Sequence, residues 1–226
     1  KGRSSRTAVI AQTKSAWAQD LPSLDHEDDD PGTTWNERAR TREPGKMSPR
    51  MAWRAITSVL PKDAIISSDI GNNCAIGNAY PTFEEGRKYL APGLFGPCGY
   101  GFPAICGAKI AQPDVPVVGF AGDGAFGISM NEMVSVGRDE WPPITMIIFR
   151  NYQWGAEKRN TTLWFDDNFV GTELDTDVTY AGIAQQCGVK GVQVDGMDAL
   201  AEALDKAIEA QMLSLIHISE PTRLRH

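Results

Sequence analysis

Residues 144–149, Ile-Thr-Met-Ile-Ile-Phe, form an unbroken run of apolar and β-branched residues in the middle of the chain. Such a run is typical of a strand buried on both faces, as in a parallel sheet covered by helices. Similar strand-like segments lie at 64–68, 115–121 and 189–194. Segments that suit helices alternate with them, at 48–60, 100–111, 128–137, 178–187 and 198–211. The alternation predicts an α/β fold, a doubly wound parallel sheet with helices on both faces.

Three of the expected strands end in polar turns. These turns are Asp-Ile-Gly-Asn at 69–72, Gly-Asp-Gly at 122–124 and Arg-Asn at 150–151. In an open parallel sheet, ligands bind beyond the carboxyl ends of the strands. We therefore expect the three turns to meet at one binding site.

The turn at 122–124 leads directly from a strand toward a helix, and Ala125 follows it. Its glycines let the backbone approach a phosphate closely, and a helix start offers N–H donors. The carboxylate of Asp123 would repel a phosphate unless a cation lay between them, and Mg²⁺ bridges carboxylate and diphosphate oxygens. The Asn151 amide oxygen and the Gln153 carbonyl could complete the set of ligands. The sequence therefore predicts a magnesium–diphosphate site.

Histidine is scarce in this chain. It occurs three times, at His26, His217 and His226. A Ser-His-Asp triad, a Cys-His dyad and a histidine-ligated zinc site are therefore not expected. Chemistry at the predicted site must come from carboxylates, amides, the backbone or a bound cofactor.

The net charge of −7 argues against a general nucleic-acid or anionic-membrane surface. There is no apolar stretch long enough for a transmembrane helix, so no membrane partner is expected. The four cysteines form no CxxC pair and match no zinc spacing. We interpret them as reduced thiols of a cytoplasmic protein.

A competing motif, Gly-Tyr-Gly-Phe-Pro-Ala at 99–104, matches the GxGxxG/A pattern of dinucleotide-binding folds. That interpretation requires a preceding strand and an acidic residue at a strand end about twenty positions later. Residues 93–98 are too rich in turn residues for a good strand, and Asp114 falls before a strand. We therefore favour the magnesium–diphosphate interpretation.

The Gly-Asp-Gly turn at 122–124, followed after 26 residues by Asn151, resembles the cofactor motif of thiamine-diphosphate-dependent enzymes. The segment 96–104 looks like the glycine-rich turn and helix that precede this motif in the family. The resemblance covers about residues 48–211. It implies the thiamine-diphosphate-binding fold, with thiamine diphosphate and Mg²⁺ as cofactors.

Within this family the chain best resembles the sulfoacetaldehyde acetyltransferases. Four segments carry this similarity: Asp-Ile-Gly-Asn at 69–72, Phe-Gly-Pro-Cys-Gly-Tyr at 95–100, Asn-Tyr-Gln-Trp-Gly-Ala-Glu-Lys at 151–158 and Phe-Val-Gly-Thr at 169–172. The resemblance implies conversion of sulfoacetaldehyde and phosphate into acetyl phosphate and sulfite. In such an enzyme the cofactor supplies the reactive chemistry, and the protein binds, orients and polarises.

The resemblance also implies roles for individual residues. Asp123, Asn151 and the Gln153 carbonyl would hold magnesium. The implied cofactor-binding residues are Gly71, Asn72, Cys98, Gly99, Gly122, Gly124, Ala125, Trp154 and Gly155. Lys158 and Arg159 could contact an oxyanion of the substrate, although a solvated charged loop explains them equally well.

Two departures from the family pattern are visible. Arg150 stands where many relatives carry an asparagine, whereas the ligand-like Asn151 is retained. Residues 160–168 differ from the usual run of the acetyltransferases, which leaves the exact substrate open.

The two ends differ in character from the middle. Residues 1–47 contain an acidic run at 25–30 and are expected to be the end of a preceding middle domain and a charged linker. The C-terminal cofactor-binding domain is expected at 48–212. Residues 213–226 resemble a translated sequencing adapter, and we expect a non-native tail outside the fold.

The resemblance places the family's catalytic glutamate in an N-terminal domain, with the active site formed between subunits. We therefore expect a C-terminal fragment, inactive alone, of an enzyme that is a homodimer or homotetramer. Two other functions remain open. One is another thiamine-diphosphate enzyme, such as an acetolactate-synthase-like carboligase or a decarboxylase. The other is a non-catalytic cofactor- or metal-binding module.

Overall fold

The computed structural model describes residues 49–81, 88–138, 140–174, 177, 179–209 and 214–219. The chain divides into two units, Lys1–Arg40 and Thr41–His226, and all the described residues belong to the second. The expected middle-domain end and linker at 1–47 lie outside the described residues.

The described strands form one six-stranded sheet in the order β2-β1-β3-β4-β6-β5, and every neighbouring pair is parallel. The strands are β1 (Ile65–Ser68), β2 (Tyr89–Leu90), β3 (Val117–Gly122), β4 (Thr145–Arg150), β5 (Lys190–Val194) and β6 (Ser214–Ser219). From β1 the chain passes outward to β2 and then returns to β3 on the other side of β1. This reversal confirms the doubly wound sheet and creates a switch point between β1 and β3.

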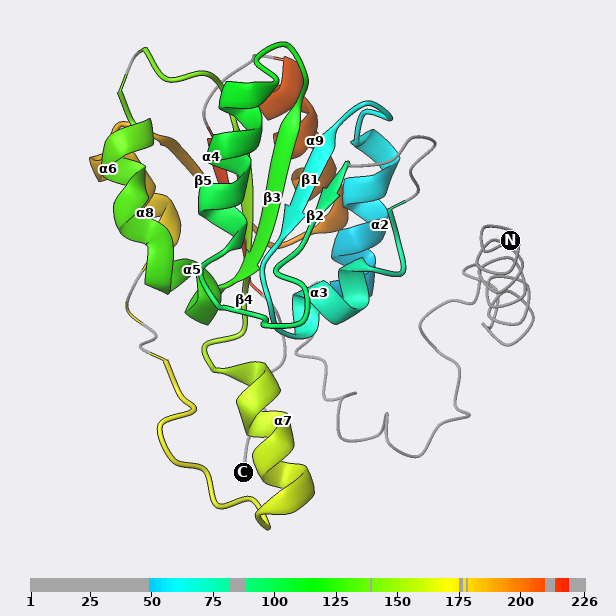
Figure 1. Cartoon of the computed structure of the whole chain (residues 1–226), viewed down its shortest axis with the longest axis vertical. Helices are drawn as coiled ribbons and strands as arrows, with labels where there is room; N and C mark the ends of the chain where they lie inside the picture. Colours follow the sequence, from blue (N-terminus) through cyan, green and yellow to red (C-terminus); the bar gives the residue numbers. More distant parts are fainter. Residues whose placement is uncertain are drawn as a thin grey trace, which may run out of the picture. The chain divides into compact units, whose positions relative to one another are not determined.

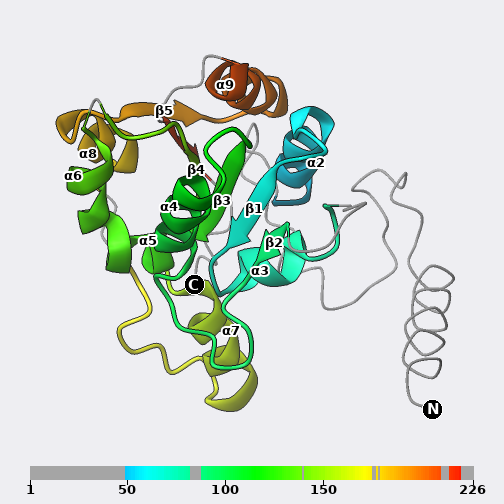
Figure 2. The same cartoon turned by 45° about the horizontal axis from the view of Figure 1, so that its top comes forward.

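Helices cover both faces of the sheet (Figures 1 and 2). One face carries α2 (Pro49–Val59) and α9 (Met197–Glu209). The other carries α4 (Gly101–Ala111), α5 (Asp123–Ser129), α6 (Met133–Val136) and α8 (Tyr180–Gln186). The short α3 (Asn72–Gly77) follows β1, and α7 (Gly155–Trp164) extends beyond the carboxyl end of β4 (Figure 1).

Alternate side chains of the central strands enter two separate cores, because successive residues of a strand point to opposite faces. On β4, Ile147 and Phe149 belong to the core under α2 and α9, whereas Met146 and Ile148 belong to the other core. Trp53 of α2 is fully buried, and its ring centroid lies 4.4 Å from that of Phe120. The all-buried pattern of β4 confirms the strand predicted from its apolar run.

Three helical segments differ from the sequence expectation. The helix expected at 128–137 instead begins at Asp123, directly after β3, and runs as α5, a 3₁₀ turn (Met130–Glu132) and α6. Helices α3 and α7 were not expected, and the sequence of α7 lacks a continuous apolar stripe. All three segments lie next to the binding edge of the sheet.

The expectation that residues 213–226 lie outside the fold is wrong for Ser214–Ser219. These residues form β6, which pairs with β4 on one side and β5 on the other. Leu215, Ile216 and Ile218 are each at most 1% exposed. The adjacent apolar residues Leu215 and Ile216 fit this position because helices cover both faces of the sheet. The adapter-like origin of the segment stays a prediction.

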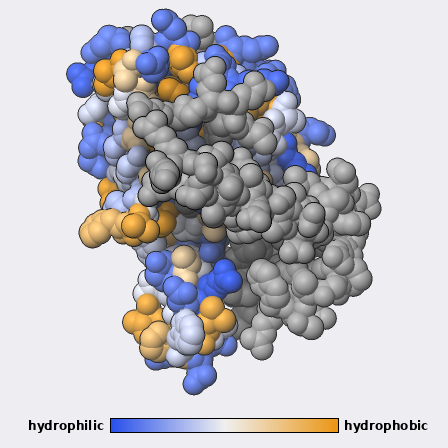
Figure 3. Space-filling view, turned by 45° about the vertical axis from the view of Figure 1, so that its right-hand side comes forward, coloured by the Kyte–Doolittle hydropathy of each residue, from blue (hydrophilic) through white to orange (hydrophobic). Residues whose placement is uncertain are grey.

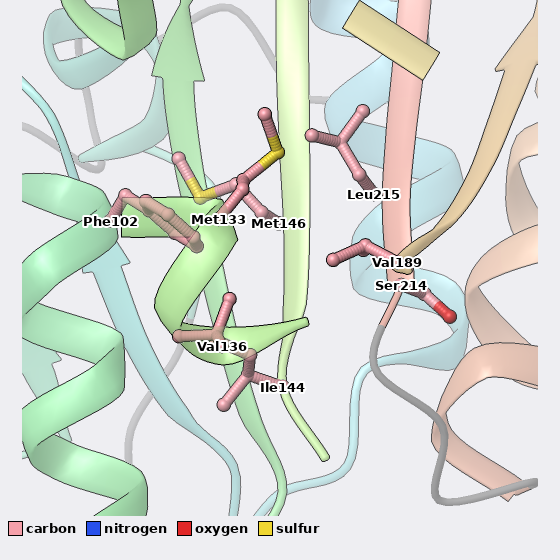
Figure 4. A pocket seen from close by; sticks show the side chains of 8 residues that line it. All are labelled: Phe102, Met133, Val136, Ile144, Met146, Val189, Ser214 and Leu215. Carbon is pink, nitrogen blue, oxygen red and sulfur yellow. The ribbon is translucent and has the colours of Figure 1, made fainter. Parts of the chain in front are cut away.

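Ser214 borders a small cavity in the core. The cavity is lined by Ser214 and seven apolar residues: Phe102, Met133, Val136, Ile144, Met146, Val189 and Leu215 (Figure 4). The Ser214 hydroxyl is buried and has no hydrogen-bond partner. A buried polar group without a partner destabilises a fold, so the start of β6 is poorly matched to its surroundings.

Within the part of the chain that the structure describes, no helix is both long and apolar enough to cross a membrane.

Candidate functional site

The turns after β1, β3 and β4 lie at one edge of the sheet. The three strands are adjacent and parallel, and their registers align Ser68 with Phe120 and Gly122 with Phe149. The predicted convergence of the three polar turns is therefore confirmed by the topology.

Asp69 organises the glycine-rich turn beside β1. Its carboxylate is fully buried and accepts N–H bonds from Gly99 (3.1 Å) and Gly101 (2.7 Å). Gly99 has φ +85°, a conformation that other L-residues rarely adopt. Burial raises the pKa of Asp69, and the backbone hydrogen bonds oppose this rise. Sequence reasoning placed Asp69 in a turn but did not identify its bonds to the 99–101 backbone.

Asp123 joins the end of β3 to the turn after β4. One carboxylate oxygen accepts the Gly124 N–H at 3.0 Å, and the other accepts the Tyr152 N–H at 2.7 Å. The side chain is 2% exposed. Burial raises the pKa of Asp123 to about 6, although these N–H bonds and the Arg150 charge lower it. The candidate metal ligand is thus a buried carboxylate held in one orientation.

Arg150 and Tyr152 stabilise the turn after β4. The guanidinium carbon of Arg150 lies 4.2 Å from the centroid of the Tyr152 ring. Tyr152 has φ 61°, in the left-handed region that non-glycine residues rarely adopt. The strained turn directs the Tyr152 N–H toward the Asp123 carboxylate.

Asn72, Asn151 and Gly155 come together at the start of α7. A Cβ on Gly155 would lie 2.7 Å from Nδ2 of Asn151 and 3.1 Å from Nδ2 of Asn72. Only a residue without a side chain leaves room for both amides. The Asn151 amide oxygen accepts the Gln153 N–H at 3.3 Å. The structure thus places Asn72, from the turn after β1, beside Asn151 and Gly155, from the segment after β4.

Trp154 lies against Gly124. A Cβ on Gly124 would be 2.9 Å from two carbon atoms of the indole ring, so a larger residue would displace it. The backbone N–H of Trp154 donates to the backbone carbonyl of Thr172 at 2.7 Å. Gly124 therefore permits a close approach of the two turns, and its contact with a cofactor stays a prediction.

Lys158 is not a free cation at this edge. It is 2% exposed, and its ammonium lies 2.5 Å from Oε1 of Glu173 and 4.8 Å from the centroid of the Phe169 ring. Arg159 is on the exposed side of the same helix. In the described structure Lys158 therefore connects α7 to the returning segment rather than facing an open oxyanion site.

Cys98 lies in the glycine-rich turn before α4 and is partly buried. Burial raises the pKa of its thiol, and the nearby carboxylates of Asp69 and Glu157 raise it further. A thiol kept protonated is a poor nucleophile. Its environment therefore fits packing beside the site better than covalent chemistry.

The predicted site residues all lie on the turns or helix starts at this edge. They occupy the β1–α3 turn (Gly71, Asn72), the turn before α4 (Cys98, Gly99), the β3–α5 junction (Gly122, Asp123, Gly124, Ala125) and the β4–α7 segment (Asn151, Gln153, Trp154, Gly155, Lys158, Arg159). Sequence reasoning missed the contributions of Asp69, Tyr152 and Glu173, and also that of Tyr180, whose hydroxyl donates to the Asp123 carbonyl at 2.9 Å. The signals for Arg150 were its place in the polar turn after a strand and its departure from the family pattern.

The donor groups suit a hard cation. In the described ranges, no three His, Cys, Asp or Glu side chains gather into a metal-binding cluster. A metal at this edge would instead use one carboxylate, from Asp123, with amide and carbonyl oxygens from Asn151 and Gln153. Carboxylate oxygens have lone pairs beyond those used by the two N–H bonds. An all-oxygen set of this kind fits Mg²⁺.

Large apolar side chains are exposed near this edge. Leu94 and Phe95 in the turn before α4 are 109% and 93% exposed. Trp164 and Phe165 at the end of α7 are 77% and 65% exposed. Figure 3 shows hydrophobic surface over α7, at the bottom of the view. Exposed apolar side chains that gather into a contiguous patch mark interaction sites, whereas single ones are ordinary.

Comparison with known proteins agrees with this geometry. Residues 69–218 match the family described as thiamine pyrophosphate enzyme, C-terminal TPP binding domain. The chain is 74% identical over 209 residues to a sulfoacetaldehyde acetyltransferase from Roseovarius nubinhibens and 72% identical to one from Rhodobacter capsulatus. Each alignment covers 92% of this chain and 35% of the relative. The chain therefore spans about a third of the length of these relatives.

A solved structure supports the fold. The chain is similar to the Rhodococcus jostii RHA1 thiamine diphosphate-dependent 4-hydroxybenzoylformate decarboxylase, with a TM-score of 0.74 and 22% sequence identity. The similarity covers 81% of this chain and 34% of that protein. The family match spans more than half of the chain and includes all three turns of the site. The chain therefore belongs to the thiamine pyrophosphate enzymes, in their C-terminal TPP binding domain family.

Proposed function

We propose that this chain is the C-terminal, cofactor-binding part of a sulfoacetaldehyde acetyltransferase. The observation that carries the proposal is the 74% identity with a relative of that name over 92% of the chain. The segment 151–158, which carries two candidate metal ligands and α7, supports it from the site itself. The fold and the donor set agree with this function.

The proposed reaction converts sulfoacetaldehyde and phosphate into acetyl phosphate and sulfite. The carbon–sulfur bond of the substrate breaks, and sulfite leaves with its electron pair. The aldehyde carbon becomes the acyl carbon and forms a bond to a phosphate oxygen. No external oxidant is needed, because the aldehyde carbon loses its hydrogen as a proton and is oxidised, while the neighbouring carbon, from which sulfite leaves, gains a proton and is reduced to the methyl group.

The proposed cofactors are thiamine diphosphate and Mg²⁺. Thiamine diphosphate, when bound, supplies the carbon nucleophile for this chemistry. Asp123, Asn151 and the Gln153 carbonyl would hold the magnesium ion. The backbone at Gly71, Gly99 and Gly122, with Asn72, Cys98, Gly124, Ala125, Trp154 and Gly155, would contact the cofactor. The compact turns exclude side-chain bulk where a diphosphate must approach the backbone.

We propose that activity requires the rest of the enzyme and a second subunit. The relatives are about three times as long as the aligned region. The exposed Leu94, Phe95, Trp164 and Phe165 support a contact surface near the site. A homodimer or homotetramer would cover such surface, whereas the isolated chain would be inactive. A cytoplasmic location is also proposed, since Cys98, Cys106 and Cys187 are free thiols.

The decisive experiment measures sulfite release by the full-length enzyme from sulfoacetaldehyde, with phosphate, thiamine diphosphate and Mg²⁺. We expect activity that requires all four components. Asp123→Ala should abolish it, whereas Asp205→Ala, an exposed position on α9, should not. Absence of sulfite release by a correctly folded, cofactor-loaded enzyme would disprove the proposed substrate.

Two further measurements on the full-length protein test the two alternatives. Consumption of pyruvate without a need for phosphate would favour an acetolactate-synthase-like carboligase or a decarboxylase. Calorimetry that detects no thiamine diphosphate binding in the full-length protein would favour a non-catalytic module. The residues 160–168, which differ from the acetyltransferase pattern, make the pyruvate control necessary.

A further inference from the structure

Arg150 is a buried cation beside the candidate metal site. It is the last residue of β4 and is only 3% exposed, which is rare for an arginine. Its guanidinium carbon lies 4.2 Å from the centroid of the Tyr152 ring and 5.8 Å from that of Tyr180. The two aromatic rings provide favourable contacts for the cation.

Both tyrosines also contact Asp123. The Tyr152 N–H donates to the Asp123 carboxylate at 2.7 Å. The Tyr180 hydroxyl donates to the Asp123 backbone carbonyl at 2.9 Å. Arg150 therefore contacts the two residues that fix the side chain and the backbone of the candidate metal ligand.

Asp123 and Arg150 carry opposite charges, and both are buried. Asp123 is 2% exposed, and a buried carboxylate is costly unless charge or hydrogen bonds compensate it. Arg150 places its buried positive charge on the ring of Tyr152, whose N–H holds that carboxylate.

The backbone of Tyr152 also needs support. Its φ of 61° costs energy for a residue with a bulky side chain and persists only when its surroundings hold it. Its N–H bond to Asp123, the Leu174 N–H on its carbonyl and the Arg150 guanidinium over its ring all hold it. Loss of one contact should loosen the others.

We propose that Arg150 is a positioning residue, a built-in cation that holds the Tyr152 turn and the Asp123 carboxylate in their binding geometry before metal and cofactor arrive. The inference rests on the proposed metal site, of which Asp123 is the carboxylate ligand. Arg150 acts through Tyr152, Tyr180 and charge, and it touches no substrate.

The first test measures amide hydrogen exchange in the cofactor-free 226-residue chain. In Arg150→Met the Tyr152 amide should exchange at least about tenfold faster than in the wild type. The Asp69 amide, which donates to the Phe120 carbonyl in the neighbouring pair of strands, serves as an internal control and should keep its protection. Arg150→Lys, which keeps the charge but not the flat guanidinium, should give an intermediate rate.

The second test is a double-mutant cycle on the thermal midpoint. Arg150→Met should lower the midpoint by about 6 °C or more, because it leaves the Asp123 carboxylate buried without its cation. In the Asp123→Asn background the same change should cost clearly less. Arg138→Met removes an exposed guanidinium and should have little effect in either background.

An equal loss of midpoint in both backgrounds, with unchanged Tyr152 exchange, would overturn the inference. Both measurements are made without cofactor, so they are independent of the proposed activity. Coupling between Arg150 and Asp123 in a protein that binds no thiamine diphosphate would refute the function alone. Cofactor binding without this coupling would refute the positioning role alone.

Discussion

The Lys158 ammonium lies 2.5 Å from the Glu173 carboxylate and joins α7 to the segment that returns toward the sheet. Close by, Gln153 and Glu173 form an antiparallel bridge, and the Leu174 N–H donates to the Tyr152 carbonyl. Residues 152–174 thus form a segment whose two ends are held together by these backbone contacts. Its first residues include Trp154 and Gly155, so the closure also positions the candidate site.

The two partners of this ion pair should respond unequally to substitution. The side chain of Lys158 is 3% exposed and that of Glu173 is 62% exposed. Glu173→Gln leaves a buried ammonium without its countercharge and should lower the free energy of unfolding by about 2 kcal/mol. Lys158→Met removes the buried charge itself and should cost less than about 1 kcal/mol. Urea unfolding of both variants measures the difference, and a larger loss in Lys158→Met would contradict it.

The stability of the metal-free chain should depend on the ionisation of Asp123. Its pKa is raised to about 6 in the folded state, above the ordinary value of 3.8. Between these values the folded state binds the proton more tightly than the unfolded state, so stability rises as pH falls. From pH 7 to pH 5 this contribution amounts to about 1 kcal/mol.

The control for this pH effect is Asp123→Asn, which cannot titrate. The difference between the pH profiles of the wild type and this variant isolates the contribution of one carboxyl group, because other groups such as Asp69 contribute to both. Urea unfolding at several pH values gives both profiles. A wild-type profile parallel to that of the variant would show that Asp123 does not titrate in this range.

Gly155→Ala should weaken cofactor binding. The added Cβ would lie 2.7 Å from Nδ2 of Asn151, so it must displace a candidate metal ligand. We expect an affinity for thiamine diphosphate and Mg²⁺ at least about tenfold lower, from the loss of about 1.4 kcal/mol. Titration calorimetry on the full-length enzyme measures this loss.

Gly107→Ala is the matched control for that substitution. Gly107 lies in α4, and a Cβ there would meet nothing within 4 Å. Alanine in a helix should stabilise the fold by up to about 1 kcal/mol and leave cofactor affinity unchanged. Equal affinities for the two variants would exclude the proposed crowding of Asn151.

Ser214→Val should stabilise the chain. The substitution removes a buried hydroxyl without a partner and places a β-branched residue that favours strands at the start of β6. A gain of about 1 kcal/mol is expected in chemical unfolding. Gln193→Val, at an exposed position of β5, adds the same side chain without removing a buried unpaired hydroxyl and should bring no such gain. A destabilised Ser214→Val would mean that the packed surroundings of residue 214 cannot accept the added methyl groups.

The sequence was sufficient to predict four of the six described strands, their parallel arrangement and the common edge of the three polar turns. The apolar run at 144–149 predicts a strand buried on both faces, and β4 is buried at every position. The polar turns after three strands predict a common edge, because parallel adjacent strands present their carboxyl ends together. These features depend on local patterns of hydrophobicity and on glycine at turns.

The tertiary structure alone decided which groups pair. Lys158 appears in the sequence as a free cation, yet Glu173 and Phe169 enclose it. Arg150 appears in the sequence as part of a polar turn and as a departure from a family pattern, but its contact with Tyr180 joins residues thirty positions apart. Such pairs arise when distant segments pack, and no periodicity in the chain records them.

The sequence by itself therefore determined the layered α/β architecture and the edge at which a cofactor can bind, because burial and turn formation are local properties of the chain. Only the tertiary structure decided that Ser214–Ser219 completes the sheet between β4 and β5 and that Arg150 contacts the tyrosines that hold Asp123. The physical reason is that a buried charge or an added strand is stabilised by neighbours that the fold supplies. Those neighbours are far apart in the chain and meet only in the packed molecule.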